Sequence, residues 1–189
     1  LSSILSACID ASLKGCNVIQ SYAPSLAGKG ASFSDFSLKE AGDMRSVMTK
    51  ADVEAQKVIV SSLRRTFVGS ELRIIGEEDD TVTISGVDDD GNNDGVSTLR
   101  MDLLHPRIQK NETAEESLPL ADLTVFVDPL DGTREFVEGR LQNVACLIGV
   151  ATNSDGRALA GAVGIPFPSY NADAETNLPP CVHYGLVGD

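Results

Sequence analysis

The most constraining feature of this sequence is an apolar run that ends on two acidic residues. Residues 123–127 are Leu-Thr-Val-Phe-Val, a composition typical of a buried strand. The next six residues, 128–133, are Asp-Pro-Leu-Asp-Gly-Thr. Because a proline restricts the backbone between the two carboxylates, Asp128, Asp131 and the Leu130 carbonyl can point toward one spot. The segment therefore predicts a strand that presents several oxygen atoms at its end.

Oxygen atoms in this arrangement are typical ligands of a hard divalent cation such as Mg²⁺, which also keeps water molecules available for chemistry. Gly132 would let a ligand approach the backbone closely. A helix beginning after Thr133 would offer its first N–H groups to a phosphate. The same residues could instead form an ordinary acidic turn, and the residue pattern alone leaves both interpretations open.

A second apolar segment also ends on acidic residues. Residues 74–79 are Ile-Ile-Gly-Glu-Glu-Asp, so a strand is expected to pass through a glycine into three carboxylates. Repelling carboxylates at a strand end require either a cation or full solvation. Solvation is the simpler interpretation of this segment alone. Together with the acidic strand end at 128–131, it favours one shared metal site, because open sheets bind ligands at strand ends.

The segment 49–52, Thr-Lys-Ala-Asp, opens a helical pattern. Thr49 suits an N-cap position, and Asp52 suits the first turn, where the helix dipole favours a negative charge. Taken alone, the segment is simply a helix N-terminus.

The remaining patterns predict one α+β domain over residues 1–189. Apolar residues at helical spacing indicate helices near 1–22 and 50–67. Strands are predicted over 72–75, 123–127, 144–151 and 158–164, with two shorter ones within 36–48. We expect the two helices to pack on a largely antiparallel sheet made of the later strands. Residues from about 80 to 118 are acidic and rich in Gly and Asn, and they predict an irregular insertion that the fold can do without.

The charge balance excludes one class of partner. The chain carries 15 Lys and Arg against 28 Asp and Glu, a net charge of −13, whereas binding to a nucleic-acid backbone requires a basic surface. Small phosphate compounds stay compatible, because a bound metal reverses the sign locally. No run approaches the ~20 apolar residues of a membrane span. The four scattered cysteines form no Cys-x-x-Cys pair, which suggests reduced core thiols and a cytoplasmic protein without a membrane partner.

Taken in order, the segments at 49–52, 75–79 and 127–136 resemble the inositol monophosphatase superfamily of Mg²⁺-dependent, lithium-sensitive phosphatases. Within it, the chain is most similar to the 3'(2'),5'-bisphosphate nucleotidases. This finer similarity lies at 137–139, 143–144, 147–151 and 160–163. The resemblance implies a sugar-phosphatase-like N-terminal half and removal of the 3'-phosphate from adenosine 3',5'-bisphosphate, with its sulfated form as a further candidate. An inositol phosphatase using the same metal site and a non-catalytic fragment are the alternatives.

The resemblance also implies a role for each matching residue. Mg²⁺ would be ligated by Glu77, Asp128, Asp131 and the main-chain carbonyl of Leu130. Asp52 and Thr133 would help to activate the attacking water, and the N–H groups of Gly132 and Thr133 would hold the scissile phosphate. No role is implied for Glu78 or Asp79.

The superfamily pattern includes a second α/β part, with another metal-binding Asp in a Trp-Asp motif and the pocket for base and sugar. This sequence has no Trp. We therefore expect residues 1–189 to form the N-terminal metal-binding domain, with the second α/β domain missing. A chain without that part would expose an apolar face and lack a wall to orient the nucleotide, so little or no phosphatase activity and self-association are also expected.

Overall fold

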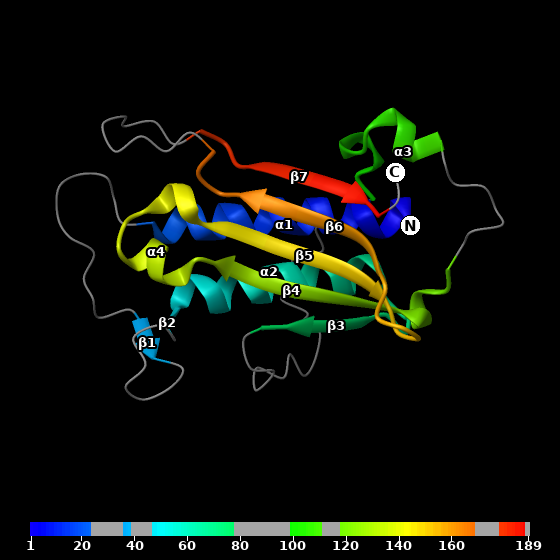
Figure 1. Ribbon diagram of the computed structural model, residues 1–189, viewed down its shortest axis with the longest axis horizontal. Coiled ribbons are helices and arrows are strands. Elements are labelled where there is room, and N and C mark those ends of the chain that lie inside the picture. Colours follow the sequence, from blue (N-terminus) through cyan, green and yellow to red (C-terminus); the bar gives the residue numbers. More distant parts are fainter. Residues whose placement is uncertain (24–35, 39–46, 78–98, 111–117, 169–177, 188–189) are drawn as a thin grey trace, which may run out of the picture.

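The computed structural model describes residues 1–23, 36–38, 47–77, 99–110, 118–168 and 178–187. The described residues build a five-stranded sheet with two long helices on one of its faces (Figure 1). The strands are β3 (Arg73–Gly76), β4 (Leu123–Asp131), β5 (Ala145–Thr152), β6 (Ala158–Ile165) and β7 (Cys181–Leu186), in that order across the sheet. β3 runs parallel to β4, and the later neighbours are antiparallel, which confirms the predicted α+β fold.

The helices α1 (Ser2–Tyr22) and α2 (Lys50–Thr66) confirm the two predicted helical segments. Their apolar residues recur every three or four positions and form one buried face on each helix. α1 packs on β5, β6 and β7, and α2 packs on β4. The close approach of α1 to β6 requires a glycine, since a Cβ at Gly164 would lie 2.4 Å from Ser12 Oγ.

A two-stranded antiparallel ribbon precedes α2. β1 (Phe36–Leu38) pairs with β2 (Val47–Thr49), in agreement with the two short strands predicted within 36–48. Because β2 ends on Thr49 and α2 begins at the next residue, the ribbon leads directly into the first turn of that helix.

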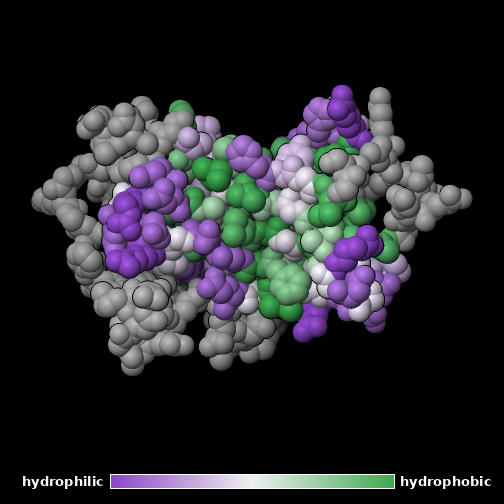
Figure 2. All heavy atoms as spheres, in the orientation of Figure 1, coloured by the Kyte–Doolittle hydropathy of each residue, from purple (hydrophilic) through white to green (hydrophobic). Residues whose placement is uncertain are grey.

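The sheet face opposite the helices is open and apolar. Phe126 and Val163 lie on this face, with 47% and 39% of their surface exposed. The residues in register with Phe126 on β5, β6 and β7 are Gly149, Gly161 and Gly185. These three strands therefore carry no side chain in that row. Figure 2 shows hydrophobic residues gathered in the middle of the molecule, with hydrophilic residues toward both ends. Large apolar side chains are therefore exposed on this face.

β7 lies where no strand was predicted. The prolines at 179 and 180 suggest an end to the β pattern, yet they precede this strand. β7 is at the edge of the sheet, and Val182, Tyr184 and Leu186 pack against the core while the residues between them are exposed. Such a short alternation on a half-buried edge strand is a weak sequence signal.

The predicted irregular insertion contains regular structure in its middle. η2 (Met101–Leu103) and α3 (Pro106–Lys110) lie within it. Leu104 is 3% exposed, and the Tyr184 hydroxyl donates to the Leu103 carbonyl at 2.8 Å and accepts from the His105 N–H at 2.9 Å. This tertiary anchoring makes residues 101–110 part of the folded core, so the prediction of an irregular segment is wrong there. The remainder of the insertion lies outside the described residues.

In the part of the chain that the structure describes, no helix is both long enough and apolar enough to cross a membrane. Cys8, Cys16 and Cys146 are buried free thiols, as expected for core residues. Cys181 is exposed instead, because its side chain lies on the face of β7 opposite to the packed Val182.

Candidate active site

The end of β4 forms a bulge and then a short helix. β4 continues to Asp131, beyond its predicted end, and α4 (Thr133–Val137) follows after one residue. The register with β5 shifts between Asp128 and Asp131, so this strand carries one extra residue there. The buried Pro129 lies within the bulge, where its missing N–H interrupts the ladder. A helix does follow this segment, and it begins at Thr133 itself.

Gly132 connects β4 to α4 in a conformation that favours glycine. Its φ angle is +86°, in the left-handed region, and it is the N-cap of α4. A Cβ at this position would also lie 2.7 Å from the carbonyl oxygen of Asn143, at the end of η5 (Leu141–Asn143). The backbone conformation and the neighbouring carbonyl therefore both exclude a side chain at this turn.

Asp52 and Thr133, the two predicted catalytic residues, are in direct contact although 81 positions separate them. The Thr133 hydroxyl has one proton, which it can donate to Asp52 Oδ1 at 2.9 Å or to the Leu130 carbonyl at 3.0 Å. The other carboxylate oxygen of Asp52 accepts from the Thr49 N–H at 2.8 Å and from the Thr49 hydroxyl. Thr49 is the N-cap of α2, as predicted.

Asp52 is 1% exposed, and its surroundings act on its pKa in two directions. Burial disfavours the charged form and raises the pKa, whereas the hydrogen bonds from Thr49 and Thr133 lower it. The net shift is upward, so Asp52 holds a proton more readily than an exposed aspartate does.

Asp128 and Glu77 meet at the ends of the adjacent strands β4 and β3. The Glu77 N–H donates to the Val127 carbonyl at 2.9 Å, which extends the pairing of these strands by one residue. Burial, a hydrogen bond with Glu77 and the charges of Glu77 and Asp131 raise the pKa of Asp128 to about 7. The Oδ1 oxygen of Asp128 is buried, and no group in the described residues donates a hydrogen bond to it.

These observations fit a cation at the strand ends. An unpartnered buried oxygen costs about 1–3 kcal/mol, and a divalent cation would satisfy it and offset the repulsion between the two carboxylates. Within the described ranges, no three His, Cys, Asp or Glu side chains converge closely enough to hold a metal. The structure thus brings Glu77 and Asp128 into contact, whereas Asp131 is exposed and acts on Asp128 through its charge. The two acidic residues after Glu77 lie outside the described residues.

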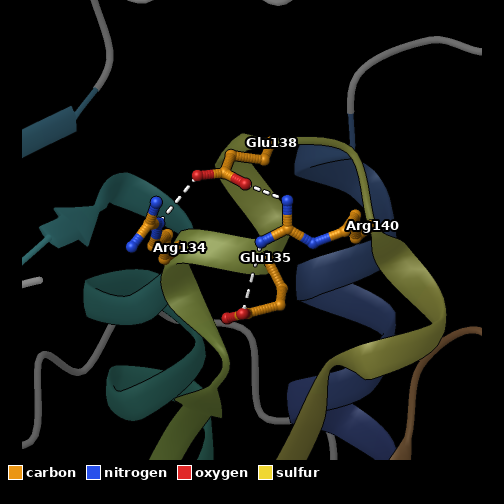
Figure 3. Close-up of polar contacts among 4 residues, drawn as sticks. All are labelled: Arg134, Glu135, Glu138 and Arg140. Carbon is orange, nitrogen blue, oxygen red and sulfur yellow. Dashed lines mark hydrogen bonds and ion pairs between the residues drawn. The ribbon is translucent and has the colours of Figure 1, made fainter.

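A charged network that no motif predicted flanks α4 (Figure 3). Arg134 Nε donates to Glu138 Oε1 at 2.7 Å. Arg140 donates to Glu138 through Nη1 and to Glu135 Oε1 through Nη2, the latter at 3.4 Å. The spacing of Arg134 and Glu138, four residues apart, is the one signal that could have indicated part of this network.

Comparison with known proteins identifies relatives of this chain. The model of the inositol monophosphatase family matches residues 1–179. The chain is 38% identical over 154 residues to human 3'(2'),5'-bisphosphate nucleotidase 1, across 82% of this chain and 46% of that protein. It is 37% identical over 138 residues to 3'(2'),5'-bisphosphate nucleotidase 1 of Dictyostelium discoideum, across 71% of this chain and 41% of that protein. The fold is similar to that of the Thermotoga maritima IMPase, with a TM-score of 0.51 and 19% identity, over 95% of this chain and 46% of that one.

The chain spans about half the length of the curated relatives that it matches. The match to the family model includes the segments that carry Asp52, Glu77 and residues 128–133. The similarity to a solved structure agrees with the helices and mixed sheet described above. The sequence match over nearly all of its residues shows that this chain belongs to the inositol monophosphatase family.

Proposed function

We propose that this chain is the metal-binding part of a Mg²⁺-dependent phosphatase that removes the 3'-phosphate from adenosine 3',5'-bisphosphate. The observation that carries the proposal is the contact between Asp52 and Thr133, next to the strand end that bears Asp128. This contact joins a proton acceptor to a hydroxyl group near carboxylate oxygens that suit a cation. The similarity to proteins named 3'(2'),5'-bisphosphate nucleotidase supports the choice of substrate.

Asp128 and Glu77 would hold the Mg²⁺ ion, with the Leu130 carbonyl and Asp131 as further oxygen ligands. When bound, the ion would supply positive charge that polarises the phosphate ester and the attacking water. The unpartnered Oδ1 of Asp128 is the atom that most clearly lacks a positive partner in the described part of the chain.

Asp52 and Thr133 would handle the proton of the attacking water. While Thr133 Oγ1 donates to Asp52 Oδ1, its lone pairs can accept a hydrogen bond from water. As the water attacks phosphorus, the bond from phosphorus to the 3'-oxygen breaks, and Thr133 takes a proton from the water and passes its own proton to Asp52. The departing 3'-oxygen takes a proton from solvent water. The raised pKa of Asp52 favours this transfer, and the two hydrogen bonds from Thr49 keep the carboxylate in place.

Gly132 and Thr133 would bind the scissile phosphate through their main-chain N–H groups. The first N–H groups of a helix have no partner within the helix, so those at the start of α4 can serve a ligand. Because Gly132 has no side chain, a phosphate can come close to the backbone at this turn. Hydrolysis would yield inorganic phosphate and adenosine 5'-phosphate.

Phosphate release from adenosine 3',5'-bisphosphate, from its sulfated form and from an inositol monophosphate, each with and without Mg²⁺, tests the proposal. We expect slow, Mg²⁺-dependent release from the nucleotides that is lost in Asp52→Asn and kept in Asp10→Asn, a change on α1. Faster release from the inositol phosphate would favour the alternative substrate. No release from any of them by a folded chain would contradict the proposal and favour the non-catalytic alternative.

A further inference from the structure

The charged network around α4 points to a role for Arg140 at the phosphate-binding turn. α4 has five residues, too few for a helix to be stable by itself. Its apolar anchor is Phe136, which is 5% exposed and whose N–H donates to the Gly132 carbonyl at 2.9 Å. Charged side chains hold the other side of this helix (Figure 3).

Arg140 links α4 to the turn that supports Gly132. Its main-chain N–H donates to the Glu135 carbonyl at 2.8 Å, and its carbonyl accepts from the Asn143 N–H at 3.0 Å. Its guanidinium reaches back to the side chains of Glu135 and Glu138. Asn143 lies against Gly132, since its carbonyl oxygen would be 2.7 Å from a Cβ there. Arg140 therefore connects the first turn of α4 with the residue that supports the glycine.

The carboxylate of Glu135 lies close to the same glycine. A Cβ on Gly132 would be 3.6 Å from Glu135 Oε2. A negative charge at this place would repel a phosphate. Arg140 Nη2 contacts the other oxygen of this carboxylate, so it offsets the charge and restrains the side chain. In a chain with a net charge of −13, such local compensation matters for binding an anion.

We propose that Arg140 is a positioning residue for the phosphate-binding turn, which it serves by offsetting the charge of Glu135 and by restraining the Glu135 side chain beside Gly132. The inference rests on the proposed function, because it requires a phosphate at this turn. Arg134 offers a matched comparison. It lies on the same helix, pairs with Glu138 and feels the charge of Glu135, but it makes no described hydrogen bond or ion pair with Glu135.

The restraint of Glu135 by the Arg140 side chain can be measured without metal or phosphate, through the Gly132 amide resonance of a chain labelled with ¹⁵N-glycine. Arg140→Gln should move this resonance clearly more than Arg134→Gln does. Arg100→Gln, which removes an ion pair with Asp102 near η2, should leave it unchanged. Equal shifts in Arg140→Gln and Arg134→Gln would overturn the inference.

The charge compensation is tested by titrating inorganic phosphate in the presence of Mg²⁺ and following the same resonance. Arg140→Gln should weaken phosphate affinity about fivefold, a size expected for the loss of a partly exposed ion pair. The double variant Arg140→Gln/Glu135→Gln should recover most of that loss. Added salt should reduce the difference in phosphate affinity between Arg140→Gln and the wild type.

A double variant as weak as Arg140→Gln alone would contradict the electrostatic role. If phosphate does not perturb the wild-type resonance at all, the proposed function fails. In that case the comparison in the phosphate-free chain still decides whether the Arg140 side chain restrains Glu135 beside Gly132.

Discussion

Asp52 and Asp128 are two carboxylates of one candidate site, and their surroundings differ sharply. Asp52 is 1% exposed and accepts hydrogen bonds on both oxygens, from Thr49 and Thr133. Asp128 is half-buried, faces Glu77 and has one oxygen without a donor among the described residues. Burial raises the pKa of both groups, but the charges of Glu77 and Asp131 add to the shift of Asp128.

The difference indicates which carboxylate serves the fold and which one needs a ligand. The protein itself satisfies Asp52, because three donors on two distant segments meet at its oxygens. Asp128 lies instead against another acidic side chain, an arrangement that disfavours the charged form until a cation arrives. Substitutions at the two positions should therefore have opposite effects on the metal-free chain.

The largest expected effect is the loss of Asp52. Asp52→Ala leaves the donors of Thr49 and Thr133 without their acceptor in a buried place, so the free energy of unfolding should fall by about 2–3 kcal/mol. Urea denaturation of the metal-free chain measures this change. Asp52→Asn, which keeps one carbonyl oxygen as an acceptor, should lose less. If Asp128→Ala were destabilised as much as Asp52→Ala, the two carboxylates would not differ in their contribution to the stability of the metal-free chain.

The second effect concerns Mg²⁺. Saturation at about 100 times the dissociation constant should stabilise the wild-type chain by about 2.7 kcal/mol. Asp128→Asn should lose most of this gain, while its metal-free form should be as stable as the wild type or slightly more stable, because carboxylate repulsion is relieved. Calorimetry and thermal denaturation with and without Mg²⁺ measure both quantities. Asp155→Asn, in the turn between β5 and β6, is the control and should keep the wild-type Mg²⁺ affinity. Unchanged Mg²⁺ affinity in Asp128→Asn would exclude Asp128 as a ligand.

A smaller effect is expected when Asp52 loses one of its three donors. Thr133→Val keeps the shape of the side chain and removes the hydroxyl, so the free energy of unfolding should fall by about 1 kcal/mol. Thr133→Ser keeps the hydroxyl and should retain most of the wild-type stability in the same urea denaturation. If valine and serine were equally tolerated, the hydrogen bond between Thr133 and Asp52 would contribute nothing to stability.

The two carboxylates also differ in how far the sequence predicts their surroundings. The strand that ends on Asp128 follows from a continuous apolar run and the acidic residues after it. The contact of Asp52 with Thr133 joins positions 81 residues apart, and no local pattern contains that information. Resemblance to a family implied that these residues act together, whereas capping preferences alone predicted a helix start.

Other parts of the fold escaped prediction because tertiary packing decides them. Residues 101–110 lack a strong period, and they fold because Leu104 is buried and Tyr184 bonds to their main chain. β7 supplies that tyrosine, and its own pattern is a half-buried alternation at a sheet edge. Each of these segments depends on the other, so neither shows its structure in its own sequence.

The smallest expected effect is on the pH dependence of stability in the metal-free chain. The pKa of Asp128 is raised from 3.8 to about 7 by burial and by its acidic neighbours. The folded state therefore holds this proton more tightly than the unfolded state. Its contribution to stability is complete below about pH 4 and is lost as the pH rises through about 7. Asp128 is only half-buried, and solvent screening reduces the effect, so we expect a loss of about 1 kcal/mol between about pH 5 and 7.5.

Urea denaturation with a chelator present, at several pH values across this window, measures the slope. Asp128→Asn should flatten it, because the amide does not titrate. Saturating Mg²⁺ should also reduce the fall in the free energy of unfolding with rising pH, because the cation binds the deprotonated carboxylate and its affinity increases with pH. The raised pKa of Asp52 acts in the same direction and should leave a residual slope in Asp128→Asn. An unchanged slope in that variant would assign the whole effect to Asp52, and the fully hydrogen-bonded carboxylate would then be the one that limits stability at neutral pH.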